Sequence, residues 1–165
     1  MLRFLSSFRA LTLIMAIVPF AFAEDPDFAS NLDGTWKSDW ALTKKHIDAE
    51  CKLTKEEISG LERLMGKMTV RYSGNHAMFT MPEIRFRKDG KDRVLEGWTS
   101  KEELNVIGRT KTQIAVLSRA VSPSIYNDSI TLINFPDADT YWVYLGYSPL
   151  VGHHVREYFR RESPK

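Results

Sequence analysis

The sequence predicts a mainly β protein, an antiparallel meander β-barrel with a helical pair between its first and second strands. Short runs of alternating apolar and polar residues recur every eight to twelve residues after position 67, with Gly, Pro, Asn or Asp residues between them. Residues 41–66 form a single stretch with helical spacing. Asp89-Gly90 is a strong signal for a two-residue hairpin turn. Together these patterns favour one β domain with one early helical interruption.

The first residues have the features of a secretory signal peptide. Arg3 and Arg9 form a positive segment, and an almost unbroken apolar run follows from Ala10 to Phe22. Ala21-Phe22-Ala23 supplies the small-x-small pattern of a cleavage site. The run is about 13 residues long, whereas a membrane-spanning helix needs roughly 20. We therefore expect cleavage after Ala23 and a secreted or periplasmic protein. The predicted organisation is a signal peptide over residues 1–23, a leader over 24–31 and a barrel domain over 32–165.

Charge and cysteine content exclude several classes of partner. The first 23 residues hold two of the 23 basic residues and none of the 21 acidic ones, so the remaining 142 residues carry 21 of each. A formally neutral chain lacks the basic excess of nucleic-acid-binding proteins, so we expect no nucleic-acid partner. Because cleavage removes the apolar run, we also expect no stable membrane span in the mature chain. Cys51 is the only cysteine, so an intramolecular disulfide is excluded.

The helical pair follows the first strand, which spans residues 32–40. Thr54 and Glu57 form a capping box at the start of the second helix, and Gly66 is a natural residue at which that helix ends. The first helix, over residues 41–50, is weaker, with Ser38 or Asp39 as its N-cap.

The rest of the chain alternates as strands. Such a series must curl, split into a sandwich or close into a barrel. One domain with a single helical interruption favours the closed barrel, and a sandwich is the alternative. The runs that follow the helices are MTVRYSG, HAMFTM, the two sides of EIRFRKDGKDRVLEGW, ELNVIGRTKTQIAVLSRA with its turn near Thr110-Lys111, DSITLINF, TYWVYLGY and HVREYFRR.

The motif GTWK at residues 34–37 resembles the first-strand Gly-x-Trp signature of the calycins, the superfamily of lipocalins and fatty-acid-binding proteins. The resemblance implies a structural role for Gly34 and Trp36, with the tryptophan as a plug at the closed end of the barrel. It also implies that a C-terminal arginine, Arg156 or Arg160, packs across Trp36 in a cation–π contact. The helical pair is similar to the portal lid of the fatty-acid-binding branch. The segments GTWKSD, YWVY and REYFRR resemble most closely a group of exported bacterial lipocalin-like proteins of unassigned function.

Arg156 and Tyr158 are the first candidate ligand-binding residues. Arg156-Glu157-Tyr158 resembles the Arg-x-Tyr pair with which the fatty-acid-binding branch holds a carboxylate, although residues 133–142 lack the second arginine of that branch. Arg156 and Tyr158 share one face of the last strand. We expect that face to be the lumen, because the alternative places Glu157 inside with Val155 and Phe159, and an unpaired carboxylate in an apolar lumen is costly.

Trp142 and Tyr144 complete the candidate ligand-binding set. They lie on the run TYWVYLGY, which is apolar on both faces, whereas a barrel strand with a solvated outside alternates. A second element is therefore expected to cover its outer face: the helix of residues 58–64, the leader, or a second copy of the chain. The functional interpretation of this apolar outer face is a surface for a protein partner or a homodimer.

No cofactor is expected, with one alternative. Nitrobindin-like haem barrels, another branch with a GTW-type start, use a histidine near the last strand as the iron ligand, which makes His153 or His154 a candidate haem ligand. No metal site is expected from the isolated His46 and His76, and no nucleophile or phosphate-loop signature occurs. The chain is therefore expected not to be an enzyme.

The expected function is that of an exported barrel that binds a small hydrophobic or amphipathic ligand, because a closed apolar lumen with few polar groups is the usual form of such sites. One alternative is a solid-core barrel that acts through its surface as a protein-interaction or inhibitor or immunity-type module. The other alternative is a haem-binding barrel.

Overall fold

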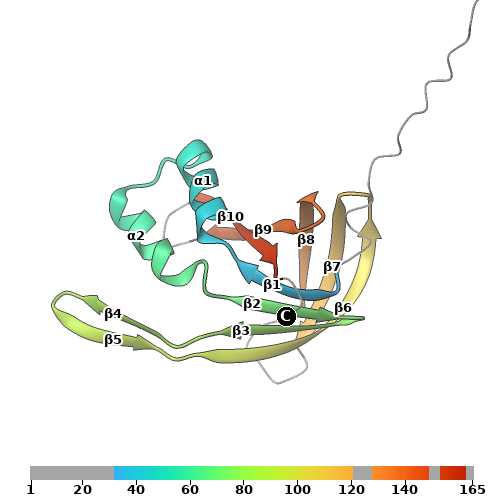
Figure 1. The fold of residues 1–165 in the computed structure, drawn as a ribbon, viewed down its shortest axis with the longest axis horizontal. Helices are drawn as coiled ribbons and strands as arrows, with labels where there is room; N and C mark the ends of the chain where they lie inside the picture. The colour runs from blue at the N-terminus through green and yellow to red at the C-terminus, as the bar shows by residue number, and fades with distance from the viewer. Residues whose placement is uncertain (1–31, 121–127, 149–152, 163–165) are drawn as a thin grey trace, which may run out of the picture.

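Eight antiparallel strands close into a barrel in the computed structural model, which describes residues 32–120, 128–148 and 153–162. The order around the barrel is β1-β10-β9-β8-β7-β6-β3-β2, and two helices lie between β1 and β2 (Figure 1). The predicted fold class is confirmed. The predicted signal peptide and leader lie outside the described residues. No helix in the described ranges is long and apolar enough to cross a membrane.

The described residues contain two helices and ten strands, and each strand corresponds to one of the runs that the sequence pattern indicated. The elements are β1 (Gly34–Ser38), α1 (Trp40–Glu50), α2 (Lys55–Leu64), β2 (Thr69–Ser73), β3 (His76–Met81), β4 (Ile84–Lys88), β5 (Lys91–Leu95), β6 (Trp98–Arg109), β7 (Gln113–Ala120), β8 (Ser129–Asp137), β9 (Thr140–Ser148) and β10 (His153–Arg161).

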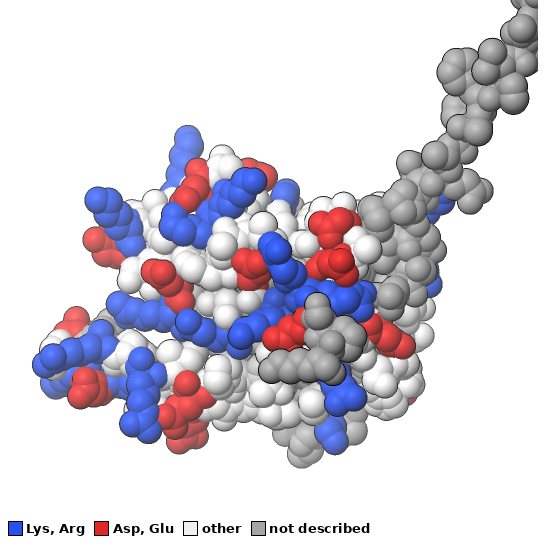
Figure 2. All heavy atoms as spheres, in the orientation of Figure 1, with Lys and Arg blue, Asp and Glu red and all other residues white. Residues whose placement is uncertain are grey.

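Two of the ten strands form a hairpin that leaves the barrel. β4 pairs only with β5, whereas β3 pairs with β6 to continue the barrel wall. Asp89 and Gly90 both have positive φ, 53° and 73°, which is the backbone of the tight turn that the dipeptide predicts. Figure 1 shows this hairpin extending past the barrel wall, and Figure 2 shows basic and acidic side chains interspersed over it. The alternation of these two strands did not indicate that they lie outside the barrel wall.

Two apolar clusters hold the fold together. The larger one joins the barrel strands and includes Trp36, Ile133 and Tyr141, all of which are at most 1% exposed. The smaller one joins the helices to the last strand through Ile47 of α1, Leu61 and Met65, and Val155 of β10. The helix of residues 58–64 therefore packs on α1 and β10, and this cluster does not include the aromatic residues of β9 that it was expected to cover.

Local capping signals place both helices. Asp39 is the N-cap of α1 and accepts a hydrogen bond from the Leu42 amide at 3.0 Å. Thr54 and Glu57 form the reciprocal capping box of α2, as their spacing predicts. These contacts are local in sequence, and they set where α1 departs from the end of β1.

Gly66 is expected to tolerate no side chain. Its φ is +76°, and a Cβ atom there would lie 2.7 Å from Cβ of Trp40. Gly66→Ala should therefore lower the free energy of unfolding by about 2 kcal/mol, through left-handed strain and overpacking together. Urea denaturation of the variant measures this loss. Gly74→Ala is the matched control, because Gly74 also has positive φ, +58°, but no atom within 4 Å of the added Cβ. Equal losses in the two variants would contradict the role of the Trp40 contact.

Candidate functional site

The barrel encloses a cavity of about 790 Å³. Apolar side chains from most strands of the barrel line it, and six of them are Val70, Leu104, Val116, Ile133, Val143 and Phe159. Three further lining residues are substantially exposed to solvent: Trp98 at 48%, Tyr144 at 48% and Leu145 at 40%. The interior is therefore an open lumen with a solvent-accessible mouth.

Trp36 belongs to the larger apolar cluster and does not line the lumen cavity. The ring of Trp36 is fully buried, with its centroid 4.8 Å from that of Tyr141 and 6.2 Å from that of Phe135. Its indole Nε1 donates a hydrogen bond to the Leu32 carbonyl at 2.8 Å. These contacts bury Trp36 completely, and its role as a barrel plug stays a prediction.

The arginine over Trp36 is Arg161. Its guanidinium lies 4.2 Å from the ring centroid, because β1 and β10 pair with Trp36 directly opposite Arg161. Its Nη1 donates to the Asp33 carbonyl at 2.7 Å and would lie 2.9 Å from any Cβ atom at Gly34. The predicted cation–π contact exists, but the assignment to Arg156 or Arg160 was wrong by one to five positions along the strand. Gly34 is needed for this close approach.

The expected orientation of the last strand was also wrong. Val155, Glu157 and Phe159 are buried, and Glu157 and Phe159 line the cavity. Arg156 and Tyr158 lie on the other face, outside the barrel wall, and neither lines the lumen cavity. The preference for the opposite orientation rested on the cost of an unpaired buried carboxylate, and Glu157 is not unpaired.

Glu157 receives its partners from the end of β1 and from the turn after α2. The hydroxyl of Ser38 donates a hydrogen bond to Oε1 of Glu157, and the Gly66 amide donates to Oγ of Ser38 at 2.7 Å. The Glu157 residue is 3% exposed. Burial raises the pKa of Glu157 to about 7, while the hydrogen bonds from Ser38 and from the Gly66 amide act in the opposite direction. The lumen therefore contains a carboxyl group that titrates near neutral pH.

Two tyrosines and a second glutamate extend this polar group of the lumen. The hydroxyl oxygens of Tyr72 and Tyr141 lie 3.4 Å apart. Burial raises the pKa of Tyr72 to about 12, the Tyr141 hydroxyl lowers it, and the charge of Glu102 raises it. Burial also raises the pKa of Glu102, against a hydrogen bond from Ser118. Apart from the exposed Lys101, the ionisable and hydroxyl-bearing side chains of the described lining residues are therefore carboxyl, phenol and hydroxyl groups.

The four residues predicted to bind a ligand come together, but around an outer cluster. The Arg156 guanidinium lies 4.5 Å from the ring centroid of Trp142 and 5.4 Å from that of Tyr144. It also donates to the Tyr144 hydroxyl at 3.3 Å and pairs with Glu50 of α1 at 3.4 Å. The Trp142 ring is 6.5 Å from that of Tyr158. This arrangement attaches α1 to the barrel wall, and of the four residues only Tyr144 also lines the lumen, at its mouth.

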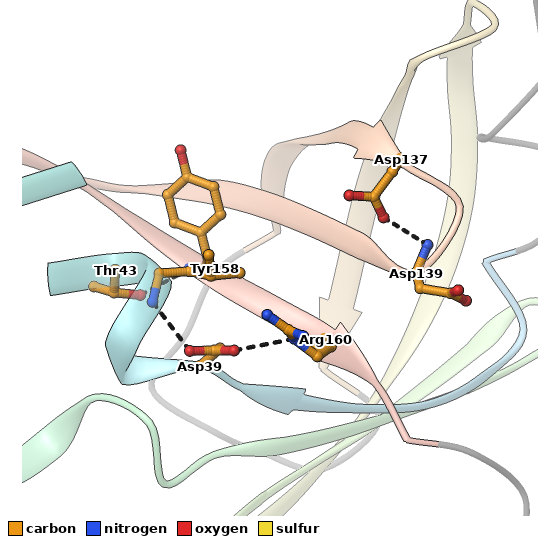
Figure 3. A network of polar contacts seen from close by, with 7 residues as sticks. Asp39, Thr43, Asp137, Asp139, Tyr158 and Arg160 are labelled. Carbon is orange, nitrogen blue, oxygen red and sulfur yellow. Dashed lines mark hydrogen bonds and ion pairs between the residues drawn. The ribbon is translucent and has the colours of Figure 1, made fainter. Parts of the chain in front are cut away.

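A second group of polar contacts fixes α1 against the edge of β10 (Figure 3). The Tyr158 amide donates to the Thr43 hydroxyl at 3.0 Å, and Nε of Arg160 donates to Asp39 at 3.1 Å. Beside them, Oδ1 of Asp137 accepts from the Asp139 amide at 2.9 Å in the turn between β8 and β9, as expected for a turn. Thr43 of α1 therefore accepts a hydrogen bond from the backbone of β10 beyond the point where β1 ends.

The remaining candidates gain no chemical role from the geometry. His154 is exposed near the start of β10, and the side chain of His153 lies outside the described residues, so the haem hypothesis stays a prediction. Burial and the charge of Glu50 raise the pKa of the Cys51 thiol, whereas the charge of Arg156 lowers it. The net increase in pKa disfavours a reactive thiolate. Among the described residues, no three His, Cys, Asp or Glu side chains are placed to hold a metal ion.

Four polar residues that face the lumen were not among the predicted ligand-binding residues: Glu102, Glu157, Tyr72 and Tyr141. Glu157, Tyr72 and Tyr141 lie on predicted strands, whereas Glu102 falls between the run that ends at Trp98 and the run that begins at Glu103. One signal was available for Glu157, because it shares a strand face with Val155 and Phe159. Nothing local indicated that Ser38, 119 positions earlier, would supply its partner.

Comparison of the chain with models of protein families, with curated proteins and with solved structures found no match.

Proposed function

We propose that this chain is an exported β-barrel that binds a small hydrophobic or amphipathic ligand in its lumen. The observation that carries the proposal is the open cavity of about 790 Å³ with mainly apolar walls. Ligand pockets are typically of roughly 300–1,000 Å³, apolar, with a few placed polar groups. The export rests on the signal-peptide pattern of residues 1–23.

The mouth of the cavity supports passage of a ligand. Trp98, Tyr144 and Leu145 line the cavity and are also 40–48% exposed, so an apolar path leads from solvent into the lumen. The solid-core alternative requires an interior filled by its own side chains, and the cavity argues against it. The proposal therefore assigns the interior, and not the outer wall, to binding.

A substitution that fills the lumen tests the proposal. Thr131 lines the cavity, whereas Leu132, the next residue on β8, is 42% exposed and does not line it. Thr131→Trp is expected to reduce uptake of the neutral fluorophore N-phenyl-1-naphthylamine to background, because the indole occupies the cavity. Leu132→Trp, the matched control, should bind as the unsubstituted protein does. Fluorescence titration measures both.

Two results would refute lumen binding. One is unsubstituted protein that takes up no hydrophobic fluorophore and shows only its apo mass when purified from its source and examined by native mass spectrometry. The other is Thr131→Trp protein that is folded by circular dichroism and binds the fluorophore unchanged.

A further inference from the structure

The ionisable side chains of the lumen carry the opposite charge to those that would bind the carboxylate of a fatty acid. Glu157 of β10 and Glu102 of β6 both line the cavity. β10 and β6 are four strands apart in either direction around the eight-stranded ring, so the two carboxyl groups belong to opposite walls. Lys101 is the only Lys or Arg among the described lining residues, and it is exposed. The segments 121–127 and 149–152 contain no Lys or Arg in their sequence.

Because the lumen is mainly apolar, the charge of its ionisable side chains strongly affects which charged ligand can enter. A charge that leaves water for an apolar cavity is costly unless it meets an opposite charge or hydrogen-bond donors. A carboxylate head group would meet Glu157, Glu102 and the buried phenols, and would repel both glutamates. An ammonium head group would meet acceptors on two walls and form charge-assisted hydrogen bonds with them.

We propose that the lumen selects an amphipathic ligand with a protonated amine as its head group, held by Glu157 and Glu102, and rejects the corresponding carboxylate. This inference rests on the proposed function, because it names the class of ligand for the same cavity. It replaces the carboxylate recognition that the Arg156 and Tyr158 pattern implied, since both of those side chains lie outside the barrel wall.

The surroundings of Glu157 add a dependence on pH. The groups that face its carboxyl are the Ser38 hydroxyl from β1, the Gly66 amide after α2 and the Tyr141 phenol from β9, with Glu102 across the lumen. The pKa of Glu157 is about 7, so part of the population is protonated at neutral pH. An ammonium group favours the ionised carboxylate, and its binding releases the proton. Amine affinity should therefore increase between pH 5.5 and pH 8, whereas the affinity for a neutral alcohol should not.

Three ligands with one chain length separate the possibilities. Dodecylamine, dodecanol and dodecanoate are each titrated, below their aggregation limits, into protein that carries N-phenyl-1-naphthylamine, and displacement gives each affinity. We expect dodecylamine to bind about tenfold or more tightly than dodecanoate at pH 7.5. Glu157→Gln and Glu102→Gln should each reduce this ratio, and Glu157→Gln should also remove the pH dependence of amine binding. Glu103→Gln, an exposed neighbour on β6, is the control and should leave the ratio unchanged.

The outcomes distinguish the inference from the proposed function. If dodecanol binds but dodecanoate binds as tightly as dodecylamine, amine selection is wrong and lumen binding stands. If none of the three ligands binds, the proposed function fails and the inference fails with it. A ratio that survives both glutamine substitutions, in variants that still bind dodecanol normally, overturns the assignment to these carboxyl groups. Should Glu157→Gln fail to fold, Glu102→Gln alone decides that assignment.

Discussion

Trp36→Ala is expected to lower the free energy of unfolding by about 3–5 kcal/mol, the usual cost of removing a large buried aromatic side chain. The ring is fully buried and lies against Tyr141 and Phe135. Its loss would also remove the surface under Arg161, whose guanidinium lies 4.2 Å from the ring centroid. Several contacts are therefore lost together, and alanine leaves a cavity that the closed barrel cannot easily collapse.

Urea denaturation followed by far-UV circular dichroism measures this loss. Trp36→Phe is the graded control, because it keeps an aromatic ring but removes the indole donor to the Leu32 carbonyl, and it should cost less than the alanine variant. A loss below about 1 kcal/mol in Trp36→Ala would show that the tryptophan is not a plug.

Glu157→Gln is expected to stabilise the ligand-free protein increasingly as pH rises. The folded-state pKa of Glu157 is about 7, above the ordinary value of 4.5. For a carboxyl group whose pKa is raised, the folded state holds the proton longer than the unfolded state does, so stability decreases as pH increases through this window. Glutamine keeps an oxygen that accepts from Ser38 and has no charge to desolvate. The difference in the free energy of unfolding, variant minus unsubstituted protein, should therefore rise by about 2–3 kcal/mol between pH 5 and pH 8.

Paired denaturation curves at pH 5, 6, 7 and 8 test this sign and size. Glu103→Gln removes one negative charge from an exposed position on β6 and controls for net charge alone. A difference that is flat with pH, or that falls as pH rises, would show that Glu157 is not a carboxyl group held protonated by burial.

The denaturation and ligand-displacement experiments on Glu157→Gln test whether Glu157 lowers the stability of the free barrel and raises its affinity for an amine. A buried carboxyl group that is neutral only below pH 7 costs stability in the free barrel, and it favours binding of a ligand with an opposite charge. Ionisable groups with strongly perturbed pKa values are often found at functional sites. Stability gained and amine affinity lost in the same variant would tie this cost to the binding site.

Features that depend on neighbouring residues could be predicted from the sequence. Thr54 and Glu57 define the start of α2 because a capping box joins residues three apart. Asp89 and Gly90 form the hairpin turn because both accept positive φ. Alternation over many short runs likewise predicted the closed sheet, because each strand must bury one face. It did not predict that β4 and β5 leave the barrel, because alternation does not specify which strands pair.

Which face of β10 lies inside the barrel depends on contacts between distant parts of the chain. Parity shows that Arg156 and Tyr158 share a face, and that Glu157 and Phe159 share the other, but it does not choose between them. The choice depends on Ser38 and Gly66, which satisfy Glu157 from distant parts of the chain, and on Trp142, Tyr144 and Glu50, which hold Arg156 outside. The register of β1 against β10 likewise brings Arg161 over Trp36. These contacts join residues far apart in sequence, so the local pattern that determines a strand carries no record of them.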